Sequence, residues 1–340
     1  MNKWFKNINK KTIITLGSVA ILGGIFILFV TGEGTTTPLT QSLPMSETKQ
    51  AEWMESFRED LLDERVPYVQ AEEDFNNTVE RLDDETKDTA VNVFVYRSEE
   101  RAAQLNALVS VLGEDIEAFD NREAGDDTLS DTFIDNIPDP AVKGVLSTIK
   151  ESNFKLKRDN DGYYGVVYDF ERLLENHGEG LSIHVTSAAK LGVHENNHTY
   201  YNMSEGYALF DQMYDRYQLM NELIEEAEEA GEENVWLEGE AYEWYAYMLG
   251  VGDYGMNSEE GGYNEQAIKE MEKVIDAHPN EPIAKDMKKI IAHMKEEGHY
   301  SEETELLAYE LRDTEYKEFI DRFSEELNES KELNESEVEE

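Results

Sequence analysis

A run of 20 uncharged residues, Thr12 to Thr31, constrains the fold of this 340-residue chain more than any other feature. As a helix the run would extend about 30 Å, which matches the hydrocarbon thickness of a bilayer. Four lysines and no acidic residue precede it. Because positive charge is retained on the cytoplasmic side, we expect residues 1–11 to be a cytoplasmic basic segment and residues 12–31 to be a single-pass transmembrane anchor. The bulk of the chain would then be extracytoplasmic, at a bacterial cell surface.

The alternative for this segment is a signal peptide that is cleaved after export. No Ala-x-Ala site follows the apolar run, and Val30 with Gly32 forms only a weak substitute. We therefore favour the retained anchor. The polar stretch 32–47, rich in Thr, Pro and Ser, is then expected to be a tether.

The charge balance and the lack of cysteine exclude several classes of function. The chain has 76 acidic and 30 basic residues, for a net charge of −46, and no cysteine. A surface this negative repels phosphate backbones, so we expect no nucleic-acid partner. High charge serves solubility first, and cation buffering or a basic partner is the functional alternative. The absence of cysteine excludes disulfides, thiolate metal sites and a lipid-modified cysteine.

Apolar residues recur at spacings of three and four over most of the chain, which predicts a mostly α protein built from helical hairpins or a bundle. We expect a helical membrane-proximal segment over residues 48–150. Residues 151–322 are expected to form a helical domain that contains one small β-hairpin and a repeat-like end. The last segment, 323–340, is acidic and poor in apolar residues, so we expect it to be disordered.

The β-hairpin is predicted where the hydrophobic period changes. Phe154–Arg158 and Tyr163–Phe170 alternate in hydrophobicity and flank Asp159–Gly162, whose Asp-Gly pair suits a tight turn. The acidic turn lacks the spacing of a calcium loop, because Lys157 stands at a ligand position and Tyr168 replaces the final glutamate.

A short stretch near the end resembles a tetratricopeptide repeat. Ala267, Met271, Val274 and Pro279 match the small, packing and terminal positions of the second repeat helix, and Lys295–Glu303 is similar to the turn between helices. The Trp, Leu and Gly of the first repeat helix are missing. The resemblance implies stacked helical hairpins, which bind peptides or partner proteins along one face.

A wider resemblance rests on the order of features along the chain. Tyr163–Phe170, Leu181-Ser182 and Glu195-Asn196-Asn197 follow an anchor and an acidic helical segment. This order is similar to that of a group of membrane-anchored exported helical proteins of Gram-positive bacteria, uncharacterised in activity. The resemblance implies an exported helical protein and assigns no reaction.

One segment, His194-Glu195-Asn196-Asn197-His198, is a literal HExxH motif. On a helix, residues four apart share a face, so His194 and His198 would bind one zinc ion and Glu195 would act as general base on the metal-bound water. This is the pattern of zinc peptidases. Asn196 and Asn197 are unusual between the histidines, and a chance match in a chain this rich in glutamate is an equally simple account.

A third zinc ligand would have to come from the segment near residue 243. Glu243 lies in a stretch that resembles the Glu-x-x-Ala helix of glutamate-type zinc peptidases, including the lethal-factor-like group, with Glu240 and Glu238 as rivals. Trp236 stands where that family often has a carbonyl-polarising tyrosine, which weakens the match. The aromatic residues of the same segment are expected to form a core stripe rather than a ligand platform.

Our first functional hypothesis is a non-enzymatic interaction or scaffold protein with a protein partner and no cofactor. The alternative is a zinc metallopeptidase that uses His194, Glu195 and His198 with Glu243.

Overall fold

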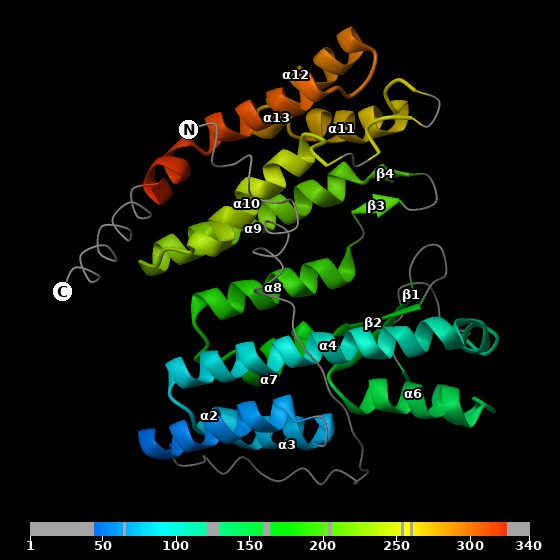
Figure 1. Cartoon of the computed structure of the whole chain (residues 1–340), viewed down its shortest axis with the longest axis vertical. Coiled ribbons are helices and arrows are strands. Elements are labelled where there is room, and N and C mark those ends of the chain that lie inside the picture. The colour runs from blue at the N-terminus through cyan, green and yellow to red at the C-terminus, as the bar shows by residue number, and fades with distance from the viewer. Residues whose placement is uncertain are drawn as a thin grey trace, which may run out of the picture. The chain divides into compact units, whose positions relative to one another are not determined.

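The computed structural model (Figure 1) describes residues 44–63, 66–120, 129–158, 164–198, 200–202, 206–252, 255–258 and 261–324. These residues are mostly helical with a small β-hairpin, which confirms the predicted fold class at that level. No helix among them is long and apolar enough to cross a membrane. The predicted anchor at 12–31, most of the tether and the acidic tail beyond residue 324 lie outside the described residues.

The chain divides into two compact units, residues 1–196 and 197–340. The predicted segments 48–150 and 151–322 stay a prediction. The β-hairpin packs on the helices before it, and the side-chain amide of Asn196 donates to the carbonyl oxygen of Tyr168 at 2.7 Å.

In the described part of the amino-terminal unit, five α-helices precede the hairpin: α2 (Glu47–Leu62), α3 (Tyr68–Thr78), α4 (Asp84–Glu117), α5 (Asp131–Asp135) and α6 (Pro140–Glu151). A short 3-10 helix, η2 (Val79–Arg81), lies between α3 and α4. The helix starts follow local chemistry. Asp83 caps α4 by accepting the N–H of Thr86 at 2.9 Å, and Asp139 caps α6 just before Pro140.

The predicted hairpin is confirmed as strands β1 (Phe154–Arg158) and β2 (Tyr164–Tyr168), which pair antiparallel. Its turn, residues 159–163, lies outside the described residues. The side chain of Asn106 on α4 bonds both backbone groups of Val166. Its Nδ2 donates to the Val166 carbonyl at 2.8 Å, and its Oδ1 accepts the Val166 N–H. The asparagine thus serves β2 as a strand neighbour would.

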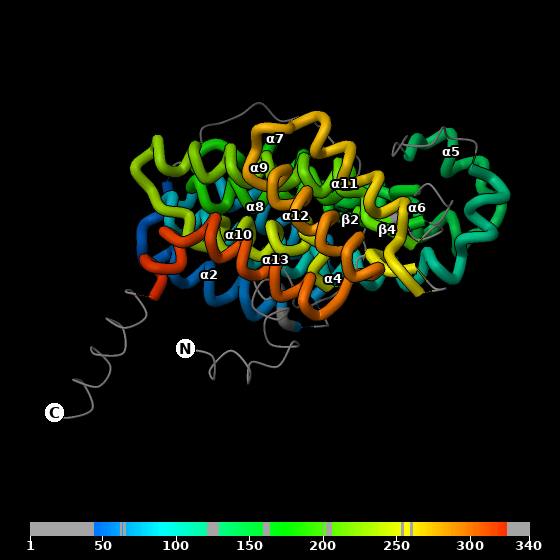
Figure 2. Tube along the Cα trace, turned by 90° about the horizontal axis from the view of Figure 1, so that it is seen from above, coloured from blue at the N-terminus to red at the C-terminus, as the bar shows by residue number. Residues whose placement is uncertain are grey.

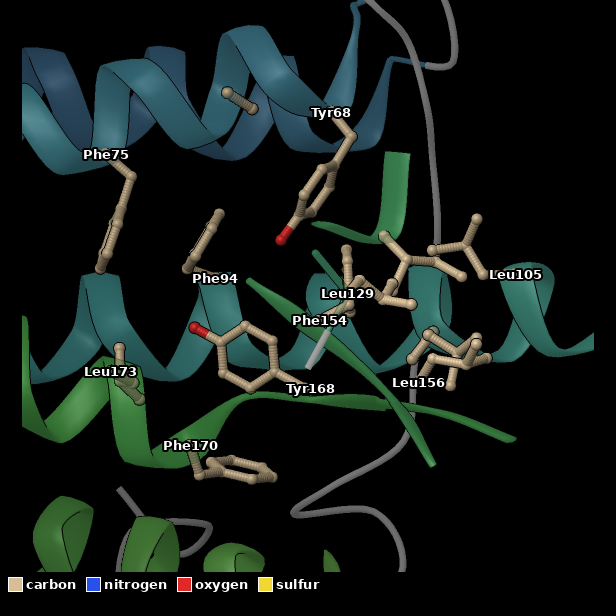
Figure 3. Packing of buried hydrophobic residues seen from close by; sticks show 14 of the residues in the cluster. Tyr68, Phe75, Phe94, Leu105, Leu129, Phe154, Leu156, Tyr168, Phe170 and Leu173 are labelled. Atoms are coloured by element: carbon tan, nitrogen blue, oxygen red, sulfur yellow. The ribbon is translucent and has the colours of Figure 1, made fainter. Parts of the chain in front are cut away.

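The core of this unit is an aromatic cluster centred on Phe94 of α4 (Figure 3). The Phe94 ring stacks on Phe75 of α3 with centroids 4.2 Å apart, and Tyr68 lies 5.9 Å away. The Tyr168 ring of β2 meets Phe94 edge-on at 6.4 Å, and Phe57 of α2 lies 6.5 Å away. Offset and edge-to-face geometries are favourable between buried rings, so α2, α3, α4 and β2 are joined at one point.

Two more helices complete the unit, α7 (Phe170–His177) and α8 (Ile183–Asn197). A Cβ atom at Gly192 of α8 would lie 2.5 Å from the Phe170 ring. Glycine therefore allows α8 to approach the start of α7 at a distance that any other residue would prevent.

The carboxy-terminal unit begins with an unpredicted strand pair, β3 (Tyr201–Asn202) and β4 (Tyr207–Ala208). The helices that follow, as Figure 2 traces, include α9 (Phe210–Ala230), α10 (Val235–Met248), α11 (Glu265–Ala277), α12 (Pro282–Glu297) and α13 (Glu302–Glu315), and residues 317–324 are also helical. Consecutive helices pack on one another as α9 with α10, α11 with α12 and α12 with α13.

The turn between α12 and α13 is set by local chemistry at both helix ends, and the repeat resemblance of this stretch stays a prediction. Gly298 ends α12 with a φ of +81°, and Ser301 with Thr304 forms a capping box at the start of α13. Asn257, in the loop between α10 and α11, contacts this turn through two hydrogen bonds of its side-chain amide. Its Oδ1 accepts the Tyr300 N–H at 2.8 Å and its Nδ2 donates to the Tyr300 carbonyl at 3.1 Å.

The contact between Asn106 and Val166 gives a stability prediction. Replacement of Asn106 by Ala leaves an N–H and a carbonyl of β2 without their partner, so the free energy of unfolding should fall by about 2 kcal/mol. Chemical denaturation measures this change. Asn92→Ala, at an exposed position of the same helix, is the control. It carries the same gain in helix propensity without the contact, so it should be neutral or slightly stabilising. Equal effects of the two substitutions would contradict the assigned role.

Candidate functional site

The structure places two of the predicted zinc-site residues on a helix and one after it. His194 and Glu195 lie in the last turn of α8, which ends at Asn197. His198 is therefore beyond the helix. His198 directly follows the last residue of α8 and lies four positions after His194.

The three candidate third ligands all lie on α10, and each has an arginine beside it. The pairs are Glu238 with Arg322, Glu240 with Arg216 at 3.8 Å, and Glu243 with Arg312 at 3.5 Å. Burial raises the pKa of Glu243, and the charge of Arg312 opposes that rise. An arginine neighbour supplies the positive charge that a carboxylate ligand would otherwise receive from a metal ion.

Metal binding by the HExxH segment stays a prediction. Within the described part of the chain, no three His, Asp or Glu side chains are grouped so that they could hold a metal ion. The chain division also falls within the motif, so that His194 and Glu195 belong to one unit and His198 and Glu243 to the other.

Glu195 has a neighbour that sequence reasoning did not identify. Burial and, secondly, the charge of Glu195 raise the pKa of Glu99 on α4 to about 8. The Glu99 Oε2 atom is buried and has no hydrogen-bond partner among the described residues. Burial disfavours the charged form, so the Glu99 carboxyl group retains its proton near neutral pH. The pair spans 96 positions of sequence (195 − 99), and no local pattern marks it.

A second buried carboxyl group lies in the core of the same unit. Glu72 of α3 is 6% exposed, and it accepts the N–H of Asn153 at 3.2 Å. Burial raises its pKa to about 7, against the opposing charge of Arg172. The hydroxyl of Tyr168 is also buried there, without a hydrogen-bond partner among the described residues. This cluster is polar and enclosed within the core of the amino-terminal unit.

His177 is buried but fully engaged. Its Nδ1 lies 3.0 Å from Glu80 and its Nε2 lies 2.9 Å from Asn76. Burial lowers its pKa, although Glu80 acts in the opposite direction. Because both ring nitrogens are used within the fold, His177 is a structural residue.

The aromatic stripe predicted on α10 packs inward in part. Tyr245 is fully buried and donates to Asp286 at 2.9 Å, and the indole N–H of Trp244 donates to the Met213 carbonyl at 2.8 Å. Tyr242 is only half-buried and lies under the guanidinium of Arg312, 3.9 Å from the ring centroid. The aromatic side chains of α10 therefore lie in the core at Tyr245 and near the surface at Tyr242.

Beyond Tyr242, aromatic side chains continue toward solvent. The Phe319 ring lies 5.8 Å from Tyr242, and Phe323 stacks on Phe319 at 5.9 Å. We call Tyr242, Phe319 and Phe323 the aromatic row. Phe323 is 47% exposed, and Leu306 on α13 is 56% exposed. No local sequence pattern marks this row, because its members come from α10 and from the segment after α13.

The chain matches no family model, no curated protein and no solved structure.

The raised pKa of Glu72 gives a prediction about pH. The folded chain holds the Glu72 proton up to about pH 7, whereas the unfolded chain releases it near its ordinary value of 4.5. The folded state therefore binds more protons between these values, and its stability should fall by about 3 kcal/mol as pH rises through this window. Glu72→Gln should remove this loss and make the protein more stable than the wild type at pH 8.

Chemical denaturation at pH 4.5, 6, 7 and 8 measures the effect, with values chosen to span the two pKa values of Glu72. Glu55→Gln, at an exposed position of α2, is the matched control and should keep the wild-type slope. A Glu72→Gln variant with an unchanged slope would show that this carboxyl group does not set the pH dependence.

Proposed function

We propose that this chain is a membrane-anchored, extracytoplasmic interaction protein whose carboxy-terminal unit binds a protein partner. The observation that carries the proposal is the partly exposed aromatic row, and Leu306 on α13 is a further exposed apolar side chain of the same unit. Two of its rings pack against the helices, and Phe323 and Leu306 present apolar surface to solvent. A rigid aromatic side chain in contact with solvent is a common anchor of protein interfaces.

The helices beneath the row supply a fixed base. Arg312 lies over Tyr242 and also over Tyr309, at 4.9 Å from the Tyr309 centroid. Tyr242 donates to Asp313 at 2.9 Å. These contacts hold α10 against α13, so a partner would meet a surface that is already ordered.

The arrangement of the acidic residues also favours binding over hydrolysis. The candidate third ligands of the zinc site have arginine neighbours, and Glu195 lies near the buried Glu99. A general base in a zinc peptidase must instead face the metal-bound water.

The test is photo-crosslinking in intact cells. A photoreactive residue at Leu306 should yield one reproducible adduct, and the same residue at Lys288, an exposed position of α12, should not. Phe323→Ala should reduce the Leu306 adduct about tenfold, because it removes an apolar anchor. Equal labelling from both positions would contradict the proposed surface.

The same preparation separates the two functional hypotheses. Elemental analysis of protein purified without added metal should show no stoichiometric zinc. About one zinc per chain, lost on His194→Ala, together with hydrolysis that Glu195→Gln abolishes, would instead support the peptidase.

The anchor is tested separately, because it rests on the sequence of residues 12–31. Fractionation should recover the full-length chain with the membranes, and protease added to intact cells should digest the part after about residue 32. A mature amino terminus between Thr31 and Gly34, with the protein free in the medium, would show that the segment is a cleaved signal.

A further inference from the structure

A second exposed apolar surface lies on α4, in the amino-terminal unit. Leu108, Val111 and Phe119 are 46%, 82% and 42% exposed, and we call them the α4 stripe. Leu108 and Val111 are neighbours on one side of α4, and Phe119 lies in the turn just after Glu117, the last residue of the helix.

The packing of α4 does not account for the α4 stripe. The adjacent side of the helix carries Leu105, Val109 and Ile116, which are buried in the core. That side alone makes α4 amphipathic enough to fold against the hairpin and α6. The α4 stripe is additional apolar surface on an otherwise acidic protein, and such surface marks contact sites.

The charges beside the α4 stripe have one sign. Glu114 and Asp115 are exposed and lie between Val111 and Phe119. Residues 102–120 contain no lysine or arginine. One basic residue reaches this end of α4 from elsewhere, because Arg158 of β1 pairs with Glu117 at 3.1 Å. That pair shows that a guanidinium binds at this end of α4. Glu114 and Asp115, the acids beside the α4 stripe, are left to a partner.

We propose that the α4 stripe binds a basic amphipathic helix of a partner protein. Its apolar side would pack on Leu108, Val111 and Phe119, and its lysines or arginines would flank Glu114 and Asp115. A second copy of the chain would bring these acids against themselves, which is unfavourable. The proposal lies on a different unit from the aromatic row and takes a partner of different chemistry, so it does not depend on the function proposed above.

The test uses the full-length protein and a labelled helical peptide of about 18 residues, with leucines on one side and lysines on both flanks. Fluorescence anisotropy should detect saturable binding. Val111→Glu and Asp115→Lys should each weaken binding about tenfold or more. Both positions are exposed, so neither substitution disturbs the core. Asn92→Glu, at an exposed position of the same helix, is the matched control and should leave binding unchanged.

Three results would overturn the proposal. A scrambled peptide of the same composition that binds equally well would show attraction to acidic surface in general. Binding unaffected by both α4 variants would place the peptide elsewhere. Self-association that disappears in Val111→Glu would identify a second copy as the occupant. A Leu306→Glu variant should bind the peptide normally, so a failure at the aromatic row is distinguished from a failure here.

Discussion

The stacking of Phe94 on its neighbours is the contact on which the amino-terminal unit depends. Its ring meets side chains from α2, α3 and β2, and it is fully buried. Loss of a buried ring of this kind costs about 3–5 kcal/mol, a large part of the stability of a typical domain. Because no disulfide is possible in this chain, packing of this kind has to join the elements. The position of α4, and with it that of the α4 stripe, follows from this cluster.

The same packing sets the chemistry of two acidic residues. Glu72 and Glu99 have their pKa values raised to about 7 and about 8, chiefly by burial. The formal charge of −46 counts both as ionised. A protein with so many surface acids can keep a few buried carboxyl groups protonated, because every further negative charge near them favours the neutral form. Burial is the main cause of proton retention at both positions, and one neighbouring acid adds to it in each case.

Local patterns in the sequence predicted the helical segments and the β1–β2 hairpin. They did not predict the contacts between these elements. The period change at Phe154 predicted the hairpin, and Pro140 with its preceding Asp139 marks the start of α6. The pairing of Asn106 with Val166 joins residues 60 positions apart, and no local period reports it. The boundary between the units depends on contacts of the same long-range kind.

The candidate site shows this difference most clearly. The HExxH motif could be recognised from the sequence of letters alone. The residue at which α8 ends could not, because it depends on the contacts of the segment that follows the helix. The arginine beside Glu243 comes from α13, 69 positions later, and spacing along the chain does not predict such a neighbour. The aromatic row was missed because two of its three members lie in a short segment after α13 that carries no recognised motif.

Two asparagines, Asn106 and Asn257, recognise main-chain groups and ignore the side chain of the residue they hold. Residues 166 and 300 can therefore change without loss of these bonds, provided that each change suits its own surroundings. Insertions and deletions are a different matter. Along a strand, successive N–H and carbonyl pairs point to opposite edges, so a shift of one residue in β2 would turn the required groups away from Asn106. Asn106 thus fixes the register of β2. Natural variation in the hairpin should therefore preserve the number of residues more strictly than their identity.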